Sequence, residues 1–192
     1  MERSLVLILD FGAQYTQLIA RRIREQHVYC EIHPCTLPFD KVRELAPKGI
    51  ILSGGPASTL EPGSPTVEKS QHREYGPATI SVQQAVGVFK SFKPEDKSNV
   101  WMSHGDRVIA LPSGFVTLAH SDGSPFAAVG NSDKHLFGVQ FHPEVAHTDR
   151  GNEMLGSFLF DVCALKPDWT SRSFIEETIS GVKEKVGAGH AV

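Results

Sequence analysis

The segment Leu5-Val6-Leu7-Ile8-Leu9 decides the fold, because it is an unbroken apolar run close to the start of the chain. Such runs are typical of central strands in parallel sheets, where both faces of the strand are buried. Gly12 follows the run, and apolar residues then recur at helical spacing, at Tyr15, Leu18, Ile19 and Ile23. The opening of the chain therefore predicts a buried strand followed by a helix.

The next residues continue this alternation of strand and helix. Val28, Cys30 and Ile32 alternate with other residues, which indicates a more peripheral strand. Residues 39–46 are a short helix candidate, and residues 49–52 (GIIL) are a third strand. This order favours right-handed crossovers and an α/β fold of the flavodoxin-like type, with a mostly parallel central sheet and flanking helices.

The pattern stops between Gly54 and Gly76, where no apolar run occurs. A structureless stretch of this length is uncommon inside a compact α/β domain. The sheet should continue here with a helix, a central strand and another helix. We infer that a helix–strand–helix unit of about 30 residues is missing from this part of the chain.

Beyond Gly76 the sequence changes to short apolar runs separated by turn residues, which predicts a small antiparallel β portion. The runs are residues 78–82, 100–102, 107–111, 115–119, 126–129 and 136–141. Residues 149–165 are then predicted to form a helix, and Thr170 or Ser171 is a candidate cap for a last helix.

Composition and charge argue against several classes of protein. The chain has 192 residues, of which 40% are hydrophobic and 21% charged, as in ordinary globular domains. The net charge of −3 gives no reason to expect nucleic-acid binding. No apolar run approaches the roughly 20 residues of a membrane span, and the early strand leaves no room for a signal peptide. Three cysteines without a CxxC spacing indicate a reducing compartment, so we expect a cytoplasmic location. His33 and Cys35 have no second pair of ligands, so no metal site is predicted.

The tripeptide His142-Pro143-Glu144 closes the last apolar run. If the run is a buried strand whose extended backbone continues through Pro143, His142 and Glu144 project to one face, about 6.5–7 Å apart at Cα. A carboxylate placed there can hold one imidazole nitrogen and leave the other to take a proton from a nucleophile. The alternative is a strand-ending turn without chemistry, because so short a motif also arises by chance.

Several segments match a known family. They are residues 8–15 (ILDFGAQY), 50–56 (IILSGGP), 73–76 (REYG), 100–106 (VWMSHGD) and 138–144 (GVQFHPE). On these segments the chain resembles the class I (triad-type) glutamine amidotransferases, and within them the glutaminase domains of GMP synthetases. The REYG and WMSHGD segments argue against an amidotransferase of anthranilate or carbamoyl phosphate synthesis.

The resemblance implies a reaction and a set of site residues. Such domains cleave the side-chain amide of glutamine through a cysteine thioester and release ammonia, without a cofactor of their own. A synthetase (ATP pyrophosphatase) domain uses ATP and Mg²⁺ to adenylylate XMP, and the ammonia then displaces AMP to give GMP. By resemblance, His142 is the general base and acid, Glu144 orients it, and Gly55 offers a backbone N–H to the oxyanion. Residues matching those that contact the main-chain groups of glutamine are Ser103, Gly105 and Asp106.

The chain departs from this family at the nucleophile. The family places a cysteine in a sharp turn of the form G-x-C-x-G-x-Q, and no such turn occurs between about residues 62 and 70. Cys30 and Cys163 fall on apolar phases of a strand and a helix, and Cys35 is predicted to lie in a loop. Buried free cysteines usually act as small hydrophobes, so none of the three is a credible replacement.

Residues 1–165 are therefore interpreted as an amidotransferase domain without its nucleophile segment. Residues 166–192 are interpreted as a connector and first helix leading to an absent synthetase domain, through which we also expect a homodimer. Either the natural polypeptide contains the segment, or it lacks the segment and has no glutaminase activity. We expect the first, because losing a central strand exposes sheet edges. The second hypothesis for the function is a catalytically dead amidotransferase-like module that binds or regulates a synthetase partner.

Other polar residues allow more than one interpretation. His104 contacts glutamine or the synthetase domain, or it is a turn residue. Asp10 follows a strand where α/β sheets bind ligands, or it caps the next helix. A solvated helix face is predicted for Arg21, Arg22 and Arg24.

Overall fold

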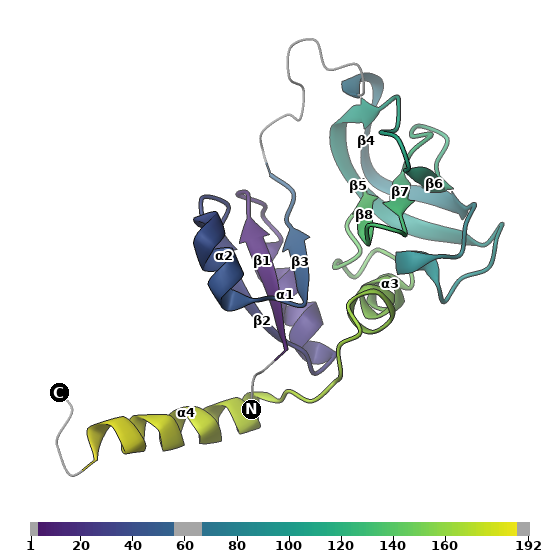
Figure 1. The fold of residues 1–192 in the computed structure, drawn as a ribbon. Helices are drawn as coiled ribbons and strands as arrows, with labels where there is room; N and C mark the ends of the chain where they lie inside the picture. The colour runs from purple at the N-terminus through teal and green to yellow at the C-terminus, as the bar shows by residue number, and fades with distance from the viewer. Residues whose placement is uncertain (1–3, 56–66, 188–192) are drawn as a thin grey trace.

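The first half of the chain forms a three-stranded parallel sheet in the computed structural model, which describes residues 4–55 and 67–187. Its strands are β1 (Leu5–Asp10), β2 (Tyr29–Pro34) and β3 (Gly49–Leu52), in the order β2-β1-β3. Helices α1 (Thr16–Glu25) and α2 (Phe39–Leu45) connect them. The predicted parallel α/β arrangement is confirmed, and Figure 1 shows this sheet as one layer beside α1.

The apolar run that opens the chain takes the central place in this sheet. β1 pairs with both neighbours, and its residues Leu5 to Ile8 are buried. The buried face of α1, with Ile19, Ala20 and Ile23, packs with Val6 and Ile8 in one hydrophobic cluster. Burial on both faces explains why the run contains no polar residue.

The second half forms a five-stranded antiparallel sheet. Its strands are β4 (Val67–Val82), β5 (Lys97–Val108), β6 (Val116–His120), β7 (Ala128–Asn131) and β8 (Leu136–Val139), in the order β5-β4-β6-β7-β8. A short 3₁₀ turn, η1 (Gly87–Phe89), lies between β4 and β5. The predicted combination of a parallel and an antiparallel part is confirmed, although the antiparallel sheet has the larger number of strands.

β4 begins earlier than the sequence predicts. Residues 67–76 were expected to lie in a structureless stretch, and this expectation is wrong, because they belong to β4 and pair with β5 at residues 67–69 and 74–76. Backbone pairing alone can hold such a ribbon, so its polar sequence carries no alternation to reveal it. The predicted gap between about residues 62 and 70 lies partly outside the described residues, which resume at Val67.

β8 is an edge strand rather than the buried strand that the apolar run 136–141 predicts. Leu136 and Val139 are exposed, and the strand ends at Val139. The buried member of the run is Phe141, which makes an isolated antiparallel bridge with Met102 of β5. The apolar run therefore combines an edge strand with one anchoring side chain.

One helix connects the two halves. α3 (Gly151–Gly156) continues into a π-helical segment, η2 (Ser157–Val162), within the predicted helix. Met154 belongs to the core of the antiparallel sheet, whereas Leu159 belongs to the core of the parallel sheet. Figure 1 shows α3 between the two sheets.

The last helix, α4 (Ser171–Val186), runs away from both sheets in Figure 1. Its predicted cap is confirmed, since the Thr170 hydroxyl accepts from the backbone N–H of Ser173 at 3.0 Å. Ile175, Ile179 and Val182 form an exposed apolar stripe on this helix. Among the described residues, no helix is long and apolar enough to cross a membrane.

Candidate active site

His142 and Glu144 meet, although not by the predicted backbone. The chain turns at Pro143 and Glu144 instead of staying extended, because β8 has ended and Pro143 cannot donate to a ladder. Even so, Nδ1 of His142 lies 2.8 Å from Oε1 of Glu144. A carboxylate oxygen accepts this hydrogen bond from Nδ1–H, which leaves Nε2 as the ring nitrogen that can take a proton.

The two side chains differ in exposure. Glu144 is 3% exposed, whereas the His142 side chain is 23% exposed. Within residues 4–55 and 67–187, Nε2 of His142 has no hydrogen-bond partner. A buried acid therefore fixes one side of an imidazole whose other side remains accessible.

Tyr15, which precedes α1, and Arg22 of α1 support this pair, and neither contact was predicted from the sequence. The ring of Tyr15 meets the His142 ring edge-on, with centroids 5.1 Å apart. Nε of Arg22 donates to the backbone carbonyl oxygen of Glu144 at 2.9 Å. The predicted solvated face is thus wrong for Arg22, while Arg21 is exposed. Only the spacing of seven residues between Tyr15 and Arg22, two helical turns, gave a sign of a shared face.

A cleft of about 230 Å³ lies between the carboxyl end of β3 and the loop after β8. Leu52 and Gly54 line one side, and Ser103 lines another with His142 and Glu144. The carboxyl ends of parallel strands are where open α/β sheets bind ligands. A larger hollow of about 630 Å³ near Tyr29 and Trp169 is wide open and contains none of the predicted site residues, so we place the site at the smaller cleft.

The turn after β3 is tied to the end of β1. Ser53 is buried, and its Oγ accepts from the backbone N–H of Phe11 at 3.0 Å. Gly55 is exposed, and a Cβ there would lie 2.5 Å from the carbonyl oxygen of Phe11. This close approach requires glycine whatever else Gly55 does.

Asp10 holds the turn that precedes α1. Its Oδ1 accepts from the backbone N–H of Gly12 and from the hydroxyl of Thr16, both at 2.8 Å. These two hydrogen bonds, the first above all, lower the pKa of Asp10 below its ordinary value. No side chain of the described residues caps the first turn of α1, so the predicted helix cap is wrong, and the ligand interpretation of Asp10 stays a prediction.

Residues 103–106 lie beside the cleft, but only the first of them lines it. Ser103 is exposed and lines the cleft, whereas Gly105 and Asp106 are half-buried beyond it. The backbone carbonyl of Asp106 accepts from Nδ1 of His104 at 2.9 Å and from Nε2 of Gln140 at 3.3 Å. His104 is not a turn residue, because it lies within β5, where its Nε2 is 3.1 Å from Oε2 of Glu74 but poorly aligned for a hydrogen bond.

In the part of the chain that the structure describes, no cysteine lines the cleft. Cys30 is buried in β2, where desolvation raises the pKa of its thiol. Cys163 packs against Gly49, and burial raises the pKa of its thiol to about 11. Cys35 is exposed beyond β2. Thiolates are the reactive form, so the two buried thiols are poor nucleophiles where they stand.

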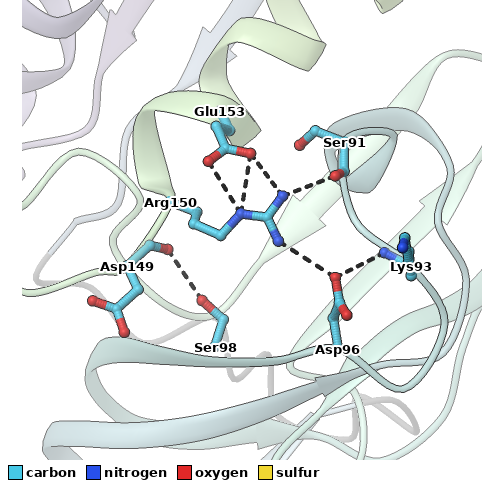
Figure 2. A network of polar contacts seen from close by, with 7 residues as sticks. All are labelled: Ser91, Lys93, Asp96, Ser98, Asp149, Arg150 and Glu153. Atoms are coloured by element: carbon cyan, nitrogen blue, oxygen red, sulfur yellow. Dashed lines mark hydrogen bonds and ion pairs between the residues drawn. The ribbon is translucent and has the colours of Figure 1, made fainter.

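A charged network fixes the residues that follow the site (Figure 2). The Arg150 guanidinium binds Glu153 at 2.7 Å, the carbonyl oxygen of Ser91 at 2.8 Å and Asp96 at 3.4 Å. It also lies 3.7 Å from the ring centroid of Phe92. The hydrogen bonds to Glu153 raise the pKa of Arg150, and the same bonds lower the pKa of Glu153. The network joins the start of α3 to the loop before β5.

Comparison with known proteins identifies the family. The family model of the class-I glutamine amidotransferases matches residues 7–69 and 60–162. The chain belongs to this family. Among curated relatives of this amidotransferase, the glutamine-hydrolysing GMP synthase of Heliobacterium modesticaldum is 42% identical, over 96% of this chain and 41% of the relative. That of Clostridium kluyveri is 44% identical, over 97% and 42%. The chain thus spans about two fifths of the length of these relatives.

Solved structures share the amidotransferase fold. A GMP synthase subunit of Thermoplasma acidophilum superposes with a TM-score of 0.72 at 24% identity, over 91% of this chain and 98% of that one. The PurLQS structure of Thermotoga maritima gives a TM-score of 0.66 at 14% identity, over 83% and 99%. At these identities the likeness concerns the fold alone.

Proposed function

We propose that this chain carries the acid–base part of a glutamine-hydrolysing site that supplies ammonia for the ATP-dependent amination of XMP to GMP. The observation that carries the proposal is the His142–Glu144 pair, with Nδ1 held by a buried carboxylate and Nε2 accessible beside the carboxyl end of β3. The GMP synthase relatives support the substrate and the pathway.

In this proposal His142 works as a base and then as an acid. Nε2 takes the proton of a cysteine thiol, and the sulfur attacks the side-chain amide carbon of glutamine. The imidazolium returns the proton to the departing nitrogen, so ammonia leaves and a thioester remains for hydrolysis by water. Glu144 keeps the ring in the required tautomer. The Gly55 backbone N–H faces the oxyanion in this scheme, and glutamine is held by Ser103, Gly105 and Asp106.

The thiol for this step is not among the three cysteines of the chain. Two comparisons support a missing segment. The family model matches the chain in two separate parts, and both parts include residues 60–69. The alignment with the Heliobacterium relative runs over 213 residues, more than the 192 of the chain. The sheet supports it too, because among the described residues β3 pairs only with β1, and Ile50 and Leu52 are exposed there. We therefore propose that the 192-residue chain alone has no glutaminase activity.

The domain organisation, the dimer and the cellular location are also proposals. Residues 1–165 form the amidotransferase domain, and residues 166–192 connect it to a synthetase domain, fused or separate, that binds ATP and Mg²⁺. The exposed stripe of α4 supports a connector that packs on a further domain. A homodimer would form through that domain, and the cytoplasmic location follows from the reducing compartment that the cysteines indicate.

A thiol-reactive glutamine analogue tests the proposal on protein from the natural source. Peptide mass mapping comes first: additional residues between about residues 62 and 70 show that the natural polypeptide contains the segment, whereas peptides that match residues 60–72 without an insertion show that it does not. For the longer polypeptide, we expect one covalent adduct on a cysteine of the segment, and much slower labelling after His142→Gln. Labelling that ignores this substitution would contradict the role of His142.

The second hypothesis, a catalytically dead module, is tested by the same labelling. It is favoured because no cysteine is among the described residues that line the cleft. It predicts that no cysteine forms an adduct and that the chain binds a synthetase partner. An adduct at the cleft would exclude it.

A further inference from the structure

The loop of residues 142–149, called here the His142 loop, is attached to β5 at both ends. At its start, the backbone N–H of His142 donates to the carbonyl oxygen of Trp101 at 3.0 Å. At its end, the backbone N–H of Asp149 donates to the carbonyl oxygen of Asn99 at 2.8 Å. The loop therefore leaves β5 and returns to it, and Glu144 is brought back to His142 within this closed path.

A side-chain hydroxyl replaces one backbone hydrogen bond at the start of this loop. Opposed residues of an antiparallel pair can exchange two N–H···O=C bonds, and Trp101 and His142 make only one directly. Instead, the backbone N–H of Trp101 donates to Oγ1 of Thr148 at 3.1 Å. The same hydroxyl donates to the carbonyl oxygen of His142 at 2.6 Å. Thr148 is buried, so water does not compete for these groups.

We propose that Thr148 is a positioning residue that holds His142 against Glu144 by bridging the His142 carbonyl and the Trp101 amide. A hydroxyl can accept from one group and donate to the other, which no apolar side chain can do. With a hydroxyl between them, the two backbone groups stay farther apart than in a direct bond. The chain can therefore leave the sheet at His142 and turn at Pro143. The inference deepens the proposed function, on which it rests for the role of His142 as a base.

The test compares two substitutions at Thr148 in the full chain. Thr148→Val keeps the shape but leaves the Trp101 amide and the His142 carbonyl without their partner, whereas Thr148→Ser keeps the hydroxyl. Thr79→Val is the matched control, because within the described residues that exposed hydroxyl of β4 binds only the Asn99 side chain, at 3.1 Å. The readouts are amide hydrogen exchange at Trp101 and His142 and the imidazole ¹⁵N signals of His142, assigned with His142→Gln.

In Thr148→Val we expect amide exchange at both positions to accelerate by about tenfold or more, with loss of the Nδ1–H signal that Glu144 holds. Thr148→Ser and Thr79→Val should stay within about twofold of the wild type. Wild-type exchange and an intact Nδ1–H signal in Thr148→Val would overturn the proposal.

If Thr148→Val does not fold, the wild-type chain still tests the proposal. Its Trp101 amide should exchange as slowly as the β5 amides that pair with β4, and exchange at the rate of an exposed amide would overturn the bridge. These measurements need neither thiol nor substrate, so failed labelling by a glutamine analogue would refute the proposed function and leave this result intact.

Discussion

Gly151→Ala is expected to destabilise the protein and to separate His142 from Glu144. A Cβ at Gly151 would lie 2.0 Å from the carbonyl oxygen of Pro143, and Cβ atoms essentially never come within 3.0 Å of another heavy atom. α3 and Pro143 must therefore move apart by about 1 Å or more. The neighbour is backbone, so no rotamer change can relieve the contact. Pro143 is also the residue between the two members of the site.

The magnitude follows from this displacement. Overpacking of this kind typically costs about 1–3 kcal/mol of unfolding free energy. For a chain of this size, each kcal/mol lowers the melting temperature by about 2–4 °C. If the shift of about 1 Å passes to Glu144, its distance of 2.8 Å to Nδ1 becomes about 3.8 Å, too long for a hydrogen bond.

Urea unfolding followed by circular dichroism measures the stability, and the ¹⁵N signals of His142 report the pair. Gly181→Ala in α4 is the matched control, because no atom of the described residues lies within 4 Å of a Cβ built there. It should leave the site unchanged and stabilise the helix by up to about 1 kcal/mol. A Gly151→Ala protein with wild-type stability and an intact His142–Glu144 pair would refute the reasoning.

Four further predictions concern charge, thiols and the exposed helix. Arg150→Lys should lose about 1 kcal/mol of unfolding free energy, because one ammonium group cannot serve Glu153, Asp96 and the Ser91 carbonyl together; an unchanged urea midpoint would contradict this. Iodoacetamide at mildly alkaline pH should modify the exposed Cys35 first, as peptide mass spectrometry can show, since burial raises the pKa of Cys163 to about 11 from 9.0. The stability contributed by that buried neutral thiol is complete below the unfolded pKa and is lost as the pH rises from 9.0 towards 11, so the Cys163→Ala protein should depend less on pH there. Ile179→Glu in α4 should change the unfolding free energy by no more than about 0.5 kcal/mol, and a larger loss in urea unfolding would show that the stripe packs within this chain.

The parallel half could be predicted because the pattern of apolar residues along its sequence matches the pattern of burial in its strands and helix. The run from Leu5 to Leu9 is apolar throughout since both of its faces are covered, and α1 shows its buried face at helical spacing. By contrast, residues 67–69 and 74–76 pair with β5 within a polar ribbon, and such backbone pairing leaves no hydrophobic alternation to detect.

The candidate site was predicted where the chemistry lies in the side chains of one short motif. His142 and Glu144 are two positions apart, so their contact is nearly local. The supporting contacts join distant positions: Arg22 approaches from α1 and Tyr15 from the residue before it, and Thr148 closes the loop through a hydroxyl. Apart from the seven-residue spacing of Tyr15 and Arg22, no pattern in the sequence indicates such contacts, since each depends on how the elements pack.

The helix from Gly151 to Val162 contributes Met154 to one hydrophobic core and Leu159 to the other. Inserting or deleting a single residue between these positions would rotate every later side chain by about 100°. Leu159 would then point away from the parallel sheet while Met154 stayed in place. We therefore expect insertions and deletions in the connecting loops of related proteins but not between these two positions, because the spacing along one helix places a side chain in each of the two hydrophobic cores.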